Sequence, residues 1–278
     1  MASFDPNSVI KRFDSAGRWI ASYTPGCRTV LLAGPLRTFR EGKVVVRHKY
    51  WVRALPEPFD GTVDKDWLKG ARQANANKAP DIIEIALQYL GARAEYGGTD
   101  KEDSGPGSDF HDYLGIPWVF VDNDGKLTQP EPDRFHSLDC SGHLRLVWGF
   151  RAHLPNPGPF GMVPLGLGEH SGVLPRRSYQ MARSGPGQLI APYANRKPDL
   201  EALEIGDLVF FDRRNTGKRG ARGIDHVGMY IGRDEAGLRR YVSSMQSTKG
   251  PTFASANDNS TLDGTGSYPA ALRAIRRL

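Results

Sequence analysis

Two short stretches decide the fold expected of this chain: LDCSGHLRLVW at 138–148 and GIDHVGMYIG at 223–232. In the first, Cys140 stands where a helix with one apolar face begins, so its thiol would face unpaired backbone N–H groups and the positive end of the helix dipole. Both favour the thiolate, which is the nucleophilic form of cysteine. A lone cysteine ahead of an apolar helix is more often a small buried hydrophobe, so this stretch alone predicts only a candidate nucleophile.

The second stretch predicts a strand that begins with a histidine. Its alternation places His226, Gly228 and Tyr230 on one face. Because Gly228 has no side chain, we expect an open space beside His226 that could admit a substrate or the end of a helix. A histidine in such a position is usually a hydrogen-bonded structural residue, but in a chain with a helix-leading cysteine it is also a candidate general base.

Four fragments, in the same order along the chain, resemble the NlpC-type cell-wall peptidases, a family of papain-like cysteine peptidases. The resemblance covers about 79–278 and implies an α+β fold in which helices pack on an antiparallel sheet. It implies no metal and no organic cofactor. The fragments are IIEIALQYLGARAEYGG at 82–98, DCSG at 139–142, GDLVFFD at 206–212 and DHVGMYIG at 225–232.

The resemblance implies a role for three catalytic residues. Cys140 would be the nucleophile, and His226 would be the general base and later the acid that protonates the leaving amine. The family carries a third polar residue on the next strand, where it orients the histidine ring. Ser243 falls at that position, where His, Asn or Gln is usual, and Gln246 is a substitute for it; Ser244 would point to the opposite face.

Three further residues, Tyr96, Asp139 and Ser141, are expected to contact the substrate by the same resemblance. The family commonly has a Tyr, one residue, a Trp and two Gly before the nucleophile. Here Ala94 stands at the Tyr position and Tyr96 at the Trp position. This departure implies either a different substrate or a replacement of the missing Tyr by Tyr96 or by a residue of 98–137.

The implied activity is hydrolysis of amide bonds in peptidoglycan stem peptides, between D-glutamate and the following diamino acid, through an acyl-enzyme on Cys140. Two alternatives keep the same fold. An acyl transferase would use the same pair to pass the acyl group to an amine or alcohol on a cytoplasmic substrate. A non-catalytic wall-binding module would use neither residue chemically, as the departures at Ser243 and Ala94 suggest.

The chain divides into two regions by pattern. Residues 1–78 are predicted to be β-rich, with strands at 28–34 and 43–55, and QANANK at 73–78 is predicted to be a linker. The first region is either a wall-binding barrel of the bacterial SH3 kind or an extension of the catalytic sheet. For 79–278 we predict helices at 80–90 and 141–151, strands at 207–211, 226–231 and 239–243, and long insertions at 98–137 and 154–198 that form the walls of a cleft.

Composition sets the class of protein. Hydrophobic residues make up 39% and charged residues 24%, which is typical of a chain with a real core. No apolar run approaches the roughly 18 residues of a transmembrane helix, and the first residues lack a classical signal peptide. We therefore expect a protein that is cytoplasmic, exported by a non-classical route or the mature form of a secreted one. A phage protein or injected toxin would also reach the wall without a signal peptide.

Charge and metal-ligand patterns limit the partners. The net charge of +6 favours an anionic partner such as a cell-wall polymer, and 213–222 alone carries five basic side chains, expected to form a solvated surface. No nucleic-acid-binding motif accompanies the charge, so we expect no nucleic-acid partner. Cys27 and Cys140 form no CxxC pair and the histidines show no zinc spacing, so no metal site is predicted. His143 is expected to point along its helix rather than act as the base.

Overall fold

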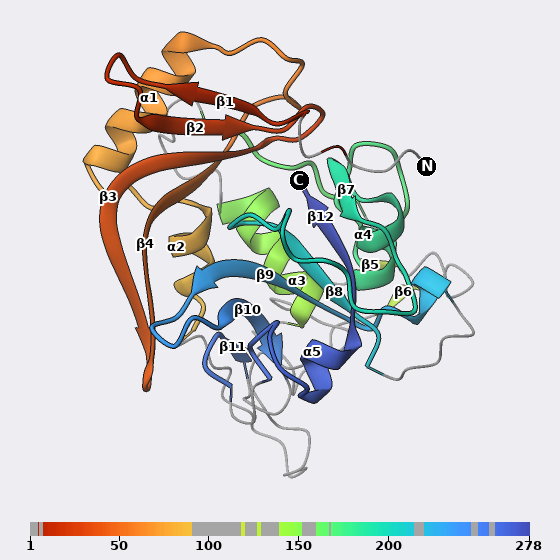
Figure 1. Cartoon of the computed structure of the whole chain (residues 1–278). Helices are drawn as coiled ribbons and strands as arrows, with labels where there is room; N and C mark the ends of the chain where they lie inside the picture. Colours follow the sequence, from red (N-terminus) through yellow and green to blue (C-terminus); the bar gives the residue numbers. More distant parts are fainter. Residues whose placement is uncertain are drawn as a thin grey trace.

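In the part of the chain that the structure describes, the protein has an α+β fold with two antiparallel sheets of four and six strands and a small two-stranded sheet (Figure 1). The small sheet pairs β5 (Trp118–Val119) with β6 (Leu127–Thr128). The computed structural model describes residues 5, 8–90, 118–119, 127–128, 139–151, 160–166, 168–213, 220–245, 250–255 and 259–278.

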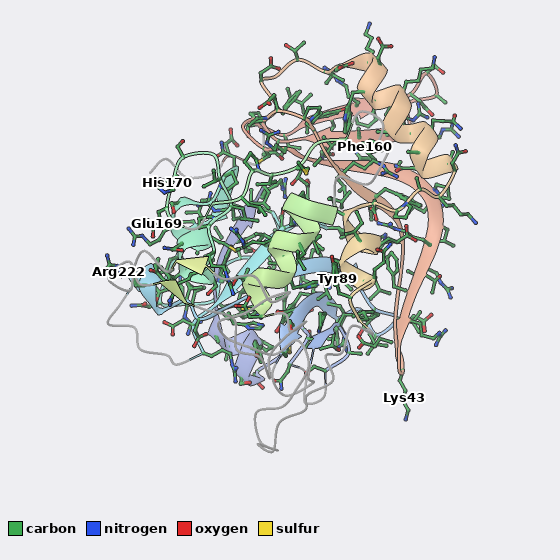
Figure 2. All side chains as sticks on the ribbon, turned by 180° about the vertical axis from the view of Figure 1, so that it is seen from behind. Lys43, Tyr89, Phe160, Glu169, His170 and Arg222 are labelled. Carbon is green, nitrogen blue, oxygen red and sulfur yellow. The ribbon has the colours of Figure 1, made fainter. Side chains whose placement is uncertain are left out.

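The N-terminal sheet is an antiparallel meander in the order β1-β2-β3-β4. The predicted strands at 28–34 and 43–55 are observed as parts of β3 and β4, which continue as a long two-stranded arm beside the rest of the molecule (Figure 1). Figure 2 shows Lys43 at the tip of this arm. The bounds are β1 (Ile10–Phe13), β2 (Trp19–Tyr23), β3 (Thr29–Glu41) and β4 (Val44–Ala54).

The linker predicted at 73–78 is wrong, because most of it belongs to helix α1 (Lys65–Ala76). The helix begins at Asp64, whose carboxylate accepts the first backbone N–H groups, and it buries Trp67 in the apolar cluster under the N-terminal sheet. Its last turn contains no apolar anchor but is held by Asn75, whose side-chain oxygen accepts a 2.7 Å hydrogen bond from Nε of Arg53. The polar residues at 73–78 therefore suggested a linker, whereas the buried hydrogen bond between Arg53 and Asn75 stabilises the last turn of the helix.

Helix α2 (Ile82–Leu87) lies within the predicted 80–90 helix but is shorter. Its N-cap, Asp81, is buried and forms a bidentate ion pair with Arg37 at 2.7 and 2.8 Å. The same carboxylate accepts the N–H of Val52 at 2.6 Å. This network ties the start of α2 to both strands of the arm.

The second sheet has the order β11-β10-β9-β8-β12-β7 with antiparallel neighbours. The three predicted strands are observed as β8, β9 and β10. The helical segments near the sheet include α5 (Ser267–Ala271) and η4 (Gly220–Gly223). The strand bounds are β7 (Gln188–Ala191), β8 (Leu208–Phe211), β9 (His226–Arg233), β10 (Arg239–Met245), β11 (Gly250–Thr252) and β12 (Leu272–Arg277).

Strand β12 was not among the strands predicted from the sequence. In the structure all of its residues are buried. Arg277 is only 1% exposed and binds the buried carboxylate of Asp207 through two hydrogen bonds of 2.8 and 2.9 Å. Arg276 donates to the carbonyl oxygen of Gly185 at 2.6 Å. Pairing with buried acceptors therefore lets a basic segment form an internal strand.

The described part of the range 154–198 contains regular structure. It contributes helix α4 (Ser178–Ser184), which buries Met181, and the edge strand β7 of the six-stranded sheet. Strand β7 pairs with β12. This part of the chain therefore belongs to the framework of the fold.

The four N-terminal strands form a sheet of their own, yet they share a core with the larger one. Val46 and Val52 of the arm lie in the same buried cluster as Ile205 and Ile231. One isolated antiparallel bridge joins Val46 to Asp234, next to the end of β9. The N-terminal region therefore packs against the six-stranded sheet without becoming one of its strands.

The predicted 141–151 helix is observed as α3 (Cys140–Leu146) followed directly by a π-helical segment, η3 (Val147–Arg151). Figure 2 shows α3 lying across the six-stranded sheet. Leu144, Val147 and Trp148 are fully buried in the shared core. Among the residues described here, we find no helix with the length and apolarity needed to span a membrane.

Candidate active site

Cys140 is the first residue of α3 and is half-buried. The helix is capped by Asp139, whose side chain accepts the backbone N–H of Gly142 and whose carbonyl accepts that of His143 at 2.9 Å. The N–H groups of Cys140 and Ser141 precede these and have no partner within the helix. Two backbone donors are therefore left beside the sulfur.

A buried arginine, Arg176, fixes the start of this helix. It is 1% exposed and donates hydrogen bonds to Oδ2 of Asp139 at 2.5 Å and to Oγ of Ser141 at 2.8 Å. The hydroxyl of Ser141 in turn donates to Oδ1 of Asp139 at 3.2 Å. Asp139 and Ser141, which we expected to contact substrate, are thus engaged with Arg176 and with each other.

Sequence reasoning missed Arg176. It stands in a Gly/Pro-rich stretch beside Arg177, and nothing in the local sequence links it to Asp139, 37 residues earlier. The one available signal was the carboxylate of Asp139, directly before Cys140. A carboxylate that is largely buried needs a basic or hydrogen-bonding partner, so its position indicated that such a partner exists but not which residue it is.

His226 opens β9 and is 7% exposed. Its Nε2 atom lies 2.9 Å from the hydroxyl oxygen of Ser243 on the neighbouring strand β10. That hydroxyl donates its own hydrogen to the carbonyl oxygen of Val227 at 2.7 Å, so it can only accept from the ring. The arrangement favours the tautomer with the ring proton on Nε2 and the lone pair on Nδ1, which is the form that a general base requires.

The structure brings Cys140 to the same end of β9. The sulfur lies against the backbone N–H of Val227, the residue that follows His226. A negative charge on this sulfur would raise the pKa of the phenols of Tyr241 and Tyr268, so both rings lie within electrostatic reach of it. The ring of Tyr268 contacts that of His226, with centroids 5.0 Å apart. Helix start, strand start and Ser243 therefore converge on one place.

The open space expected beside Gly228 does not exist. A Cβ atom at this position would overlap Cδ2 of Tyr241 and would lie 3.0 Å from the carbonyl oxygen of Val242. Glycine is needed here because the ring of Tyr241 packs directly on the backbone. The aromatic group around His226 is completed by Phe211, at a centroid distance of 5.8 Å.

Burial sets the charge state of the pair. It raises the pKa of the Cys140 thiol to about 12, and the nearby Asp139 carboxylate acts in the same direction. The N–H groups of Val227 and Ser141 oppose this, but by less. Burial, with the positive charge of Arg213, lowers the pKa of His226 to about 3. The thiolate expected from the helix start is therefore not favoured, and the resting pair is a neutral thiol and a neutral imidazole.

Cys27 and His143, the histidine that follows Cys140 in the same helix, are both buried and hydrogen-bonded to backbone carbonyl groups. Cys27 is buried, its thiol donates to the carbonyl oxygen of Arg277 at 3.4 Å, and burial raises its pKa to about 12. His143 is fully buried, its Nε2 lies 3.1 Å from the carbonyl oxygen of Ala86, and burial lowers its pKa to about 4. His143 thus links α3 to α2.

Several predicted residues fall outside the described part of the chain: Tyr96, Ala94, Gln246 and nearly all of 98–137. Their roles stay predictions. Over the described ranges, no three His, Cys, Asp or Glu side chains gather closely enough to hold a metal ion.

Comparisons with known proteins add no relative: no family model, no curated protein and no solved structure matches this chain.

Proposed function

We propose that this protein is a cysteine hydrolase of the papain-like, NlpC type that cleaves amide bonds in peptidoglycan stem peptides. One observation supports it above all others. Ser243 holds Nε2 of His226 at 2.9 Å, while the sulfur of Cys140 lies at the N–H of the next residue, Val227. A nucleophile, a base and an orienting hydroxyl on a helix and two adjacent strands are the parts that thiol acyl transfer needs.

The first half of the reaction forms an acyl-enzyme. Nδ1 of His226 takes the thiol proton of Cys140 as the sulfur attacks the amide carbonyl carbon, and the carbonyl electron pair moves to oxygen. The N–H groups of Cys140 and Ser141 then donate to this oxyanion. As the oxyanion collapses, the C–N bond breaks, and the imidazolium gives its proton to the leaving amine.

The second half regenerates the enzyme. Water enters where the amine left, and Nδ1 of His226 takes one of its protons as the oxygen attacks the thioester. The C–S bond then breaks, the carboxylic acid product leaves, and the proton returns to the sulfur of Cys140. Because the pair is neutral at rest, the proton transfer accompanies the attack instead of preceding it.

The substrate class follows from the resemblance to the NlpC type, which implies the bond between D-glutamate and the diamino acid. The net charge of +6 supports an anionic polymer as the larger partner. The hydrogen-bonded Ser243 supports catalysis over a purely wall-binding role, because a binding module has no need of an oriented imidazole.

The test uses purified stem-peptide fragments and mass spectrometry of the products. Cys140→Ser and His226→Ala should each lose at least about a hundredfold in turnover. Cys27→Ser is the matched control, because this thiol is buried against the carbonyl of Arg277, and it should keep its activity. Unchanged turnover in either of the first two variants would end the proposal. Product analysis with an added amine separates hydrolysis from acyl transfer.

A further inference from the structure

One exposed cation lies against the aromatic side chains of the site. Arg213 follows β8 and places its guanidinium carbon 4.4 Å from the ring centroid of Tyr268. Tyr268 in turn contacts the ring of His226, with centroids 5.0 Å apart. The backbone N–H of Arg213 donates to Oδ1 of Asp225 at 3.1 Å, which fixes the chain where it leaves the strand.

Arg213 differs from the buried arginines in the partners that surround its charge. The described part of the chain gives its guanidinium no ion pair, whereas buried arginines such as Arg37 and Arg277 are paired with carboxylates. The carboxylate next to the nucleophile, Asp139, is already paired with Arg176. Burial lowers the pKa of His226 and the positive charge of Arg213 adds to this, whereas at Tyr268 the same charge only partly opposes the rise caused by burial, so Arg213 lies within electrostatic reach of the base.

We propose that Arg213 determines specificity by binding a free carboxylate of the substrate beside the scissile amide. This inference rests on the proposed function and narrows its substrate class. A guanidinium recognises a carboxylate through two parallel hydrogen bonds, and stacking on Tyr268 holds its plane in place. In a γ-D-glutamyl bond, the α-carboxylate of the glutamyl residue is the group that meets this requirement.

The experiment compares two peptides that differ in one group: a γ-D-glutamyl–diamino acid peptide with a free α-carboxylate, and the same peptide with an α-carboxamide. The native enzyme should prefer the carboxylate by about tenfold to a hundredfold in kcat/KM, mostly through KM. Arg213→Met should bring this ratio close to one, and Arg213→Lys should restore part of it. Equal preference in the native enzyme and Arg213→Met would overturn the inference.

Arg222 provides the matched control, because it is an exposed arginine of the same basic stretch. Figure 2 shows it at the edge of the molecule. Arg222→Met should keep the native preference for the carboxylate. Loss of the preference in this variant as well would show a general effect of surface charge, which contradicts a specific role for Arg213.

A binding measurement tests this inference separately from the proposed function. Calorimetry of both peptides against Cys140→Ala, with and without Arg213→Met, measures carboxylate recognition without turnover. If carboxylate binding depends on Arg213 but the native protein cleaves neither peptide, the inference stands and the hydrolase proposal fails. If cleavage depends on Cys140 while neither binding nor kcat/KM depends on Arg213, the hydrolase stands and the inference fails.

Discussion

The hydroxyl oxygen of Ser243 lies 2.9 Å from Nε2 of His226 while its hydrogen is donated to the carbonyl of Val227 at 2.7 Å. This pair of contacts gives the small serine side chain a fixed direction. A serine can therefore orient the imidazole at a position where the resemblance leads one to expect a larger His, Asn or Gln.

Ser243→Ala should lower kcat by about tenfold to a hundredfold, because Nε2 loses its acceptor and the ring is free to adopt the other tautomer. KM should change little. Ser243→Thr keeps the hydroxyl and should recover part of the rate. Ser244→Ala, an equally buried neighbour in the same strand, should retain activity; a loss as large as that of Ser243→Ala would point to damage of the strand instead.

Thiol reactivity should follow the neutral state of the pair. Because burial raises the pKa of Cys140 to about 12, its alkylation by iodoacetamide should be slow at neutral pH and should keep rising through pH 9. The measurement is the rate against pH in a Cys27→Ser background. A rate that is high and flat from pH 5 to 8 would instead show a preformed thiolate–imidazolium pair.

Arg176→Met should lower the free energy of unfolding by about 2–4 kcal/mol, because it leaves the Asp139 carboxylate without its buried partner at the start of α3. Chemical denaturation measures this. The comparison variant is Arg183→Met, whose partly exposed ion pair with Glu169 should contribute less than about 1 kcal/mol. Equal effects in the two variants would contradict a positioning role for Arg176.

Three buried histidines should make the fold sensitive to acid. Burial lowers the pKa of His48 and His143 to about 4 and that of His226 to about 3, from 6.5. Below pH 6.5 the unfolded chain therefore binds more protons than the folded chain. The free energy of unfolding falls as the pH drops from 6.5 towards 4. Above pH 6.5 these histidines do not change the free energy of unfolding with pH.

Denaturant titrations between pH 4 and 8 test this dependence. Each histidine adds up to about 1.4 kcal/mol per pH unit within its window. His170→Ala, at an exposed position, should leave the slope unchanged. A stability that stays level down to pH 4 would contradict the burial of these rings as neutral groups.

The sequence allowed the positions of the central strands and of the candidate dyad to be predicted, because each carries a strong local pattern. The alternating run at 226–231 is observed as strand β9, and the cysteine ahead of an apolar helix is observed as the first residue of α3. Strand β12 could not be found in this way. Its arginines are buried only because Asp207 and the carbonyl of Gly185 lie beside them in the folded chain.

The details of the site depended on tertiary contacts. The helix dipole favoured a thiolate, but desolvation of Cys140 outweighs it, and the extent of burial is not written in the local sequence. Gly228 suggested an open space, yet the ring of Tyr241 fills it from the neighbouring strand. Arg176 lies far along the chain from Asp139, so their ion pair had no local signal.

The most direct test of the central claim is to trap the acyl-enzyme. Native protein would be mixed with a γ-D-glutamyl–diamino acid peptide, quenched in acid and digested, and the peptide that carries Cys140 would be weighed by mass spectrometry. We predict an added mass equal to the acyl half of the substrate on Cys140, with none on Cys27 and none in His226→Ala. Turnover of the peptide with no adduct, or undiminished turnover by Cys140→Ser, would contradict the account.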